Sequence, residues 1–288
     1  MTWRTFSLLL LSVFFGQTVP SRNGLNPRSY TIHVPSVDQN PAYSSTAWVV
    51  ELPAKSILTL FALGRQIASQ ESGLPIASSF AELVADPKNE LVTNGGFSED
   101  YGGQPAGLLL VASHIVHSFG KERTPRGSLR LSGLLCQSRT GALSILKTED
   151  YSAAPRKILD RCFSAIQAGP ILALEGRNGI EPSELTSRRA ETRTVVALSE
   201  SGRVSFVIFT RPIHLHAAAA FITAKERSAR SKEVSQAWVD GRLRANVGLG
   251  LKSALNLDGS SSSVVAFRGT TIVGDPRRLL PSAIAVRF

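Results

Sequence analysis

The sequence of 288 residues has no apolar run of about twenty residues, the length that a helix needs to cross a hydrocarbon core. Its amino terminus carries a much shorter run, residues 6–16, which is uncharged and follows the positive charge of Arg4. This arrangement is typical of a signal peptide, so residues 1–20 are predicted to direct export to the periplasm or the extracellular space. Because no small-residue cleavage site is well defined, an uncleaved membrane anchor stays open as the alternative. No further transmembrane span is predicted.

Cysteine is scarce, and this excludes several classes of protein. The chain has only Cys136 and Cys162, too few for a disulfide framework, and they form no C-x-x-C pair of the kind that binds zinc or exchanges electrons. In an exported protein the two can form one disulfide, whereas two buried thiols are the alternative. The sequence assigns no cofactor and no metal, which both stay unknown.

Aromatic residues are also few, at 7%, although the formal net charge is +10. The basic residues are spread along the chain and are not gathered in one tail. A nucleic-acid surface would interleave basic residues with aromatic ones, so no nucleic-acid partner is predicted. The charge fits an anionic substrate or an anionic envelope surface. Nothing in the sequence predicts the oligomeric state.

What is present is a globular composition, with 43% apolar and 19% charged residues. Residues 21–44 are predicted to be a linker or a first strand, and residues 45–288 a single domain. Many short apolar and β-branched runs are joined by short turns, for example 194–198 and 203–209 across a Ser-Gly turn. We therefore expect an α+β fold of largely antiparallel sheets flanked by helices. The helices are expected within residues 56–69, 155–166, 214–227 and 232–247.

Several common catalytic motifs fail on their spacing or context. A serine hydrolase elbow of the G-x-S-x-G type is missing, because no second glycine follows the serines after Gly259. The glycines of 248–250 lead into a predicted strand, whereas a dinucleotide-binding loop leads into a helix. The histidine pairs within 114–117 and 214–216 have no carboxylate at a helpful spacing, so metal ligation is the less favoured interpretation.

One stretch combines a buried strand with a polar end. Residues 254–257 are mostly apolar, and Asp258-Gly259 and four serines follow. Asn256 and Asp258 lie two apart and point to the same side of an extended strand. Small hydroxyl residues after a glycine offer O–H and N–H donors to an oxygen-rich ligand. The same pattern also fits a hairpin turn with solvated serines, and the pattern alone does not decide.

Other polar positions carry similar alternatives. Asn94-Gly95-Gly96-Phe97 follows a strand, and its glycine pair predicts a close approach of the backbone or a positive φ. Arg193 stands at the entry to a strand, where it can pair with a phosphate or be a solvated charge. A phosphate leaves readily as an anion, so such a substrate needs fewer carboxylates than an ordinary glycoside. The carboxylate candidates are Asp258, with Glu175 as second choice, and Glu99 and Asp100.

Taken together, these stretches resemble the phosphodiester glycosidase family, over roughly residues 45 to 288. The matches occur in the order of the family, and they are Thr93-Asn94-Gly95-Gly96-Phe97, Pro105-Ala106-Gly107-Leu108-Leu109, Ala168-Gly169-Pro170-Ile171-Leu172 with Gly176, Arg193-Thr194 with Ser201-Gly202, and Asn256-Leu257-Asp258-Gly259 with Ser262. The carboxyl-terminal run, residues 280–286, is similar to the last strand of the family.

The resemblance implies a hydrolase that cleaves a sugar 1-phosphodiester of an envelope or extracellular glycan, with a phosphorylated glycan as partner. The expected catalytic residues are Asp258 as acid/base or electrostatic stabiliser, Arg193 on the phosphate, and Asn94. The expected substrate-binding residues are Gly95, Gly96, Gly169, Thr194, Asn256, Gly259, Ser261 and Ser262.

The sequence departs from the family at Ser260 and Ser261, where the family usually has glycine, at Ser98, where it often has a second aromatic, and in a longer segment over 221–247. The added Cβ and hydroxyl groups of the two serines narrow the conformations of the loop. A non-catalytic glycan-binding module of the cell envelope, with the cleft kept and turnover lost, is therefore the alternative function.

Overall fold

The structure is a computed structural model that describes residues 27–36, 41–64, 74–99, 103–120, 130–154, 156–180, 189–225, 233–239 and 242–287. The predicted signal peptide, residues 1–20, lies outside the described residues. Within the described part of the chain, no helix is long and apolar enough for a membrane span.

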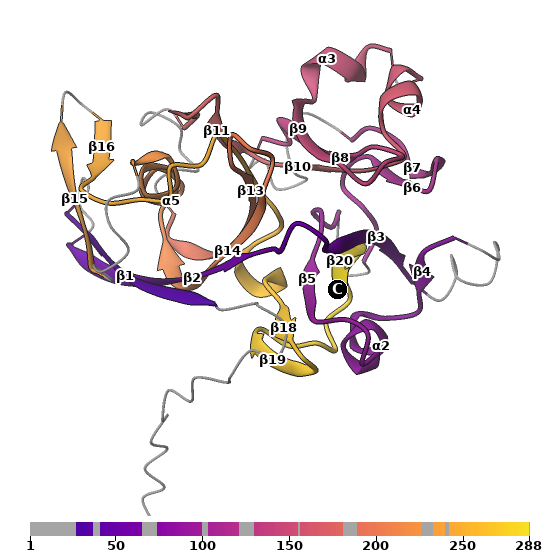
Figure 1. Cartoon of the computed structure of the whole chain (residues 1–288), viewed down its shortest axis with the longest axis horizontal. Coiled ribbons are helices and arrows are strands. Elements are labelled where there is room, and N and C mark those ends of the chain that lie inside the picture. The colour runs from indigo at the N-terminus through magenta and orange to yellow at the C-terminus, as the bar shows by residue number, and fades with distance from the viewer. Residues whose placement is uncertain are drawn as a thin grey trace, which may run out of the picture.

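The largest sheet has nine strands and curves around a helix (Figure 1). The helix α5 (Leu215–Thr223) is buried along most of its length by apolar side chains. Its four consecutive alanines bring the helix backbone close to the strands. The strand order is β12 (Arg177–Asn178), β11 (Ile171–Leu174), β17 (Ser253–Asn256), β13 (Glu191–Leu198), β14 (Val204–Ile213), β2 (Tyr43–Glu51), β1 (Arg28–Val34), β15 (Glu233–Val239) and β16 (Arg242–Ala245).

A second sheet has five strands and carries the disulfide between Cys136 and Cys162, which confirms that the two cysteines can pair. The short helices α3 (Glu149–Ser152) and α4 (Lys157–Arg161) lie beside this sheet (Figure 1). The strand order is β7 (His114–His117), β6 (Leu109–Val111), β10 (Ser164–Ala168), β8 (Gly133–Gln137) and β9 (Leu143–Lys147).

A third sheet has six strands, and helix α2 (Phe80–Ala85) packs against it. The order is β19 (Thr270–Val273), β18 (Val265–Phe267), β5 (Leu91–Asn94), β20 (Ser282–Arg287), β3 (Ile57–Leu63) and β4 (Ile76–Ala77). The 3-10 helix η2 (Ser260–Ser262) joins β17 to β18. Neighbouring strands are antiparallel in all three sheets, except β1 with β15 and β3 with β4 among the described pairs.

The expected α+β class is wrong, although the antiparallel pairing agrees with the prediction. The described chain is 48% strand and 13% helix, with four α-helices. Two of the expected helices are strands. Within residues 56–69 the strand β3 buries Leu58, Leu60 and Ala62 in strict alternation. Residues 232–247 contain the hairpin β15–β16, in which Val234 and Gln236 are buried in alternation.

Two further predicted elements agree more closely with the structure. The hairpin predicted over 194–198 and 203–209 is confirmed as β13–β14. The helix predicted within 214–227 is confirmed as α5. Within 155–166 only α4 is helical, and β10 begins at Ser164.

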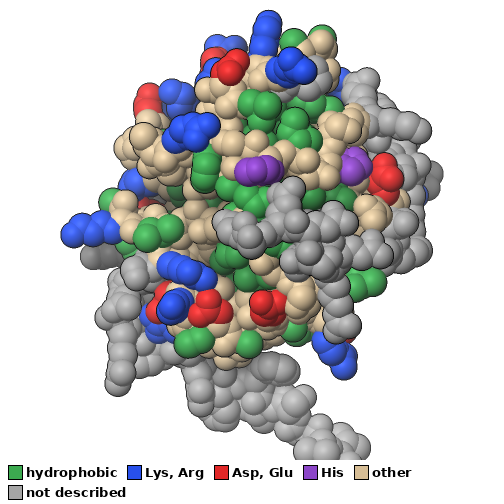
Figure 2. Space-filling view, turned by 90° about the vertical axis from the view of Figure 1, so that its right-hand side faces the viewer, with side chains coloured by type: hydrophobic (Ala, Val, Ile, Leu, Met, Phe, Trp, Pro, Cys, Tyr) green, Lys and Arg blue, Asp and Glu red, His purple; other side chains and the backbone are tan. Residues whose placement is uncertain are grey.

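The surface in Figure 2 carries basic and acidic side chains side by side. On this face the net charge of +10 is therefore not gathered into one basic patch. Residues from the three sheets contact one another at a junction formed by Asn94, Gly169 and the loop after β17.

Candidate functional site

Asn94 connects the six-stranded sheet to the loop after β17. It ends β5, and its side chain is fully buried. Its Nδ2 donates to the carbonyl of Asp258 at 2.7 Å, and its Oδ1 accepts from the hydroxyl of Thr194 at 3.0 Å and from the amide of Val264 at 3.2 Å. With these bonds made, the amide of Asn94 fixes the backbone position of Asp258.

The glycine pair after Asn94 allows the backbone to approach its neighbours closely. A Cβ on Gly95 would lie 2.4 Å from Ser282 Oγ, and one on Gly96 would lie 2.7 Å from Ile166 Cγ2. The carbonyl of Gly95 accepts from the Asp258 amide at 3.1 Å. The close approach expected for this pair is therefore confirmed, and it brings the five-stranded and six-stranded sheets against the Asp258 loop.

Gly169 and Asn256 clamp two strand ends together. The Gly169 amide donates to the Asn256 carbonyl at 2.9 Å, and Asn256 Nδ2 donates to the Gly169 carbonyl at 2.9 Å. Gly169 has φ +155°, and a Cβ there would lie 2.2 Å from the Arg130 carbonyl oxygen, so only glycine fits. Asn256 is fully buried, and its Oδ1 has no hydrogen-bond partner among the described residues.

Asp258 is the buried carboxylate of this junction, 8% exposed. Its Oδ1 accepts from the Gly259 amide at 2.8 Å. Burial raises the pKa of Asp258 to about 7, and the hydrogen bond from Ser262 and the Gly259 amide lower it only in part. At neutral pH the carboxyl therefore exchanges a proton readily, which is what a general acid or base requires.

The serines of the loop after Asp258 differ in burial. Ser262 is buried, whereas Ser260 and Ser261 are exposed. Ser260 has φ +55°, in the left-handed region that favours glycine. This backbone angle gives a physical reason why a glycine is expected there.

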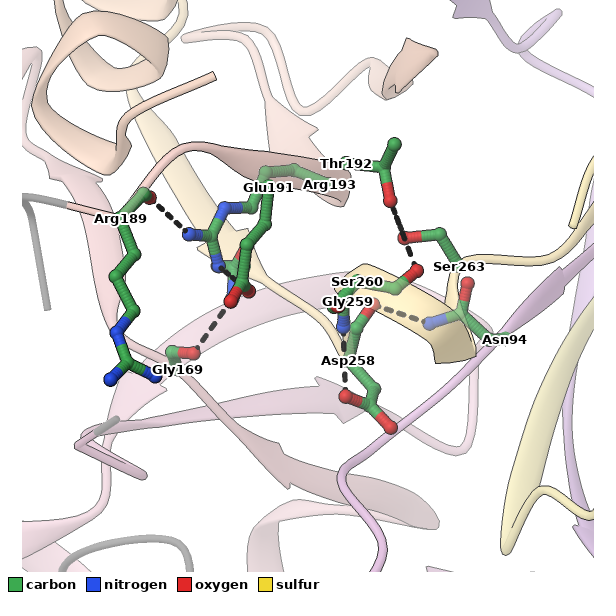
Figure 3. Close-up of polar contacts among 11 residues, drawn as sticks. Asn94, Gly169, Arg189, Glu191, Thr192, Arg193, Asp258, Gly259, Ser260 and Ser263 are labelled. Carbon is green, nitrogen blue, oxygen red and sulfur yellow. Dashed lines mark hydrogen bonds and ion pairs between the residues drawn. The ribbon is translucent and has the colours of Figure 1, made fainter. Parts of the chain in front are cut away.

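Arg193 lies beside this loop and is 1% exposed. Its Nη2 donates to the Arg189 carbonyl at 3.1 Å, and its Nη1 lies 3.6 Å from Glu191 Oε2 (Figure 3). Neither Nε nor Nη1 has a hydrogen-bond partner among the described residues. Burial lowers the pKa of Arg193, and the charges of Glu191, Tyr43 and Asp258 oppose this shift. Burial of a guanidinium with two unused hydrogen-bond donors lowers the stability of the protein. An anionic ligand would accept hydrogen bonds from these donors.

Gly259, the residue after Asp258, packs closely against Thr192 and Arg193. A Cβ on Gly259 would lie 3.0 Å from the Thr192 carbonyl oxygen and 3.6 Å from Arg193 Nη1. The Thr192 hydroxyl also donates to the Ser260 carbonyl at 3.0 Å. The loop from Asp258 to Ser262 therefore packs along the start of β13, where the guanidinium lies.

Sequence reasoning missed three residues near this pair. Glu191 stands two residues before Arg193, and this spacing on one strand could have indicated a shared face. Tyr43 contacts His214 Nδ1 through its hydroxyl at 2.6 Å, and burial raises the pKa of Tyr43 to about 12. Arg278 lowers the pKa of Asp258 by its charge. No local pattern in the sequence indicates the last two.

The other carboxylate candidates lie apart from the junction. Glu175 is exposed in the turn between β11 and β12, and Glu99 is exposed in the loop after β5. Asp100 lies outside the described residues. Cavities of about 440 and 730 Å³ lie at the Ser199–Arg203 turn and between α2 and the β18–β19 hairpin, also away from Asp258.

The histidines form no evident metal site. His214 and His216 are buried with their rings stacked 5.5 Å apart, and His114 is exposed on β7. No group of three or more histidine, cysteine, aspartate and glutamate side chains that could hold a metal is present within the described ranges.

The molecule is thus a β-rich protein in which a buried arginine, Arg193, lies beside the loop that follows a buried carboxylate, Asp258. The chain belongs to the phosphodiester glycosidase (NAGPA) family, whose model matches residues 88–287. No curated protein sequence matches the chain.

Solved structures show a similar fold. The auto-inhibited catalytic domain of zebrafish N-acetylglucosamine-1-phosphodiester alpha-N-acetylglucosaminidase aligns with a TM-score of 0.61 at 12% identity, over 92% of this chain and 83% of that chain. A hypothetical protein from Synechocystis aligns at 0.48 and 13% identity, over 91% of this chain and 61% of that chain. A protein of Burkholderia pseudomallei aligns at 0.48 and 13% identity, over 86% of this chain and 75% of that chain. At 12% identity the likeness to the zebrafish domain concerns the fold alone.

Proposed function

We propose that this protein is an exported hydrolase that cleaves the bond between a sugar and the phosphate of a sugar 1-phosphodiester in an envelope or extracellular glycan. In this proposal residues 1–20 direct export, and the domain spans 45–288. The observation that carries it is the fully buried Arg193, whose Nε and Nη1 donors are unused and which lies beside the loop that follows the buried Asp258. Membership of the phosphodiester glycosidase family supports the substrate class.

Arg193 would bind the phosphate. Its Nε and Nη1 donors are fixed by burial and have no hydrogen-bond partner among the described residues. Charge-assisted bonds from such donors stabilise an anion more strongly than neutral ones, and they gain strength where water is excluded. The hydroxyl of Ser261 and the backbone of Gly259 lie on the same loop and would complete the contact.

Asp258 would act as the general base in its ionised form. Water adds its hydroxyl to the anomeric carbon, the bond from this carbon to the phosphate oxygen breaks, and the water proton passes to the Asp258 carboxylate. The phosphate monoester leaves as an anion with the bonding electrons, so no strong acid is needed on that side. A base with a pKa of about 7 suits this step near neutral pH.

The remaining predicted residues would hold this pair in place. Asn94 and Thr194 fix the backbone of Asp258, and Asn256 and Gly169 fix the end of β17. Gly95 and Gly96 allow the sheets to meet, and Ser262 bonds to the carboxylate. Asn94 thus acts through Asp258 and makes no contact with the substrate in this proposal.

The test is hydrolysis of UDP-N-acetylglucosamine and of a methyl sugar 1-phosphodiester by the parent, Asp258→Asn and Arg193→Ala. We expect both variants to fold, by circular dichroism, and to lose nearly all turnover. In the parent, kcat/KM should rise with pH up to about 7 and then level off, because the base must be ionised. Equal rates in parent and variants would contradict the assignment. Substrate binding without turnover in the parent would favour the glycan-binding module.

A further inference from the structure

The carboxylate of Glu191 lies near the guanidinium of Arg193 but makes no hydrogen bond to it. The distance from Glu191 Oε2 to Arg193 Nη1 is 3.6 Å, longer than a charge-assisted hydrogen bond, and Nη1 has no hydrogen-bond partner among the described residues. The Glu191 side chain is 32% exposed, whereas that of Arg193 is 1% exposed. The carboxylate of Glu191 is therefore partly exposed to solvent, and Figure 3 shows it beside the guanidinium of Arg193.

Glu191 and Arg193 lie at the start of β13, opposite an irregular stretch of β14. Between these two residues β13 advances by two positions whereas β14 advances by four, so the extra residues of this β-bulge lie in β14. Bulges are frequent beside active sites. Glu191 pairs with Ile213 across this shift, and Arg193 pairs with Phe209. The two charged residues therefore lie at the same end of β13, one of them buried and the other partly exposed.

The charges around a bound phosphate can then be counted. Arg193 brings one positive charge, Glu191 brings one negative charge 3.6 Å from it, and Asp258 on the neighbouring loop brings a second negative charge when it is ionised. A phosphodiester carries one negative charge, whereas a phosphomonoester carries nearly two above pH 7 because its second pKa is about 6. The extra charge of the monoester would face the carboxylate of Glu191.

We infer that Glu191 is a specificity-determining residue that favours singly charged phosphodiesters over doubly charged phosphomonoesters through repulsion across the Arg193 site. This inference rests on the proposed function. Rejection of a wrong ligand by a like charge is a common means of specificity. The same repulsion would weaken the binding of the phosphomonoester product, which has one more negative charge than the phosphodiester substrate.

The experiment measures binding by titration calorimetry at pH 8, so that it does not depend on turnover. The ligands are N-acetylglucosamine 1-phosphate and its methyl diester, each with the parent, Glu191→Gln, Glu191→Asp and Glu51→Gln. For the titrations with the diester, each of these proteins also carries Asp258→Asn, so that the diester is not hydrolysed during the measurement. Glu51 is the matched control, since its carboxylate also contacts arginines and is 36% exposed, but it lies on the edge of the 440 Å³ cavity.

We expect Glu191→Gln to tighten binding of the monoester by roughly tenfold and to change binding of the diester by less than about threefold. Glu191→Asp keeps the charge and should keep most of the preference, and Glu51→Gln should keep all of it. An unchanged preference in Glu191→Gln overturns the inference, and so does a failure of the protein to bind either ligand.

Kinetics separate this inference from the proposed function. If the Asp258-containing Glu191→Gln variant loses more than about a hundredfold in kcat on the diester, Glu191 takes part in bond cleavage and the inference is wrong. If the parent prefers the diester in binding but cleaves no sugar 1-phosphodiester, the proposed function fails and the inference stands.

Discussion

The two ends of the β13–β14 hairpin each carry an arginine near a glutamate, and they differ in burial. At one end Arg193 is 1% exposed, and its Nε and Nη1 have no hydrogen-bond partner among the described residues. At the turn Arg203 is 60% exposed and contacts Glu51, which also lies 3.6 Å from Arg28. A surface pair of this kind contributes little free energy because water screens it.

Burial therefore distinguishes the candidate site from the surface pair at the turn, whereas charge does not. Both ends lie in the same two strands, and both would be read from the sequence as basic residues beside acidic ones. Only the Arg193 end lies where the three sheets meet, and there the protein forgoes the solvation of a guanidinium. The unfavourable desolvation of a buried charge is typical of functional sites, where a bound ligand can offset it.

The largest expected effect is on the arginines themselves. Arg193→Lys should lower kcat/KM on a sugar 1-phosphodiester by about a hundredfold to a thousandfold, since lysine cannot present two fixed donors. Arg203→Lys should change it by less than about twofold. Steady-state kinetics at pH 7.5 measure kcat/KM for both variants. An equal loss of kcat/KM in the two variants would show that the buried and the exposed arginine do not differ in function.

The second effect concerns Asp258 and the pH dependence of stability. Its pKa is about 7 in the folded protein and near 3.8 when unfolded, so the folded state binds more protons between these values. The contribution to stability is fully present below about pH 4 and is lost as the pH rises through 7, with a magnitude on the order of 4 kcal/mol.

Asp258→Asn should remove this part of the slope. Urea unfolding of the parent and the variant at pH 4.5, 6 and 8 measures the difference between them at each pH. If that difference is the same at all three pH values, the carboxyl is not buried as described, and the contrast between the two hairpin ends weakens.

The third effect tests whether the site depends on the five-stranded sheet. Replacing both Cys136 and Cys162 by alanine should lower the free energy of unfolding by about 3 kcal/mol, because the disulfide closes a loop of 26 residues. The rate of hydrolysis at 25 °C should change little, since Arg193 and Asp258 lie on other elements. Urea unfolding and kinetics on the same preparation measure both. A large loss of rate in a folded variant would show that this sheet positions the site.

The smallest effect concerns the loop itself. Ser260→Gly should raise the free energy of unfolding by up to about 1 kcal/mol, because glycine adopts φ +55° without the strain of a Cβ. Ser261→Gly, at the exposed neighbour without a positive φ, is the control and should be neutral or slightly destabilising. Thermal unfolding distinguishes the two. A destabilised Ser260→Gly would mean that the hydroxyl of Ser260 contributes more than its backbone angle costs.

Much of the fold was predictable where the local pattern had one interpretation. The β13–β14 hairpin has β-branched runs on both sides of a Ser-Gly turn, and α5 has four consecutive alanines. Residues 57–63 were ambiguous because Leu58, Phe61 and Ala62 fit a helical spacing, whereas Leu58, Leu60 and Ala62 fit a strand. Pairing with β20 selected the strand.

The hairpin β15–β16 shows the same limit. Its first strand pairs with β1, with Glu233 beside Thr31, about two hundred residues earlier in the chain. No local window contains such a partner, so the stretch reads as a helix when taken alone. The helices were likewise expected outside the sheets, whereas the largest sheet curves around α5 (Figure 1).

The sequence by itself determined the motifs, their order and the family to which they point, because glycine, asparagine, arginine and aspartate at these positions are needed for local backbone and chemical reasons. Only the tertiary structure decided what each one does. Asn94 is a clamp and not an exposed polar group, Arg193 is buried and not solvated, and Glu191 lies beside it. The physical reason is that burial, unused donors and the pKa of a carboxyl depend on neighbours that come from three different sheets.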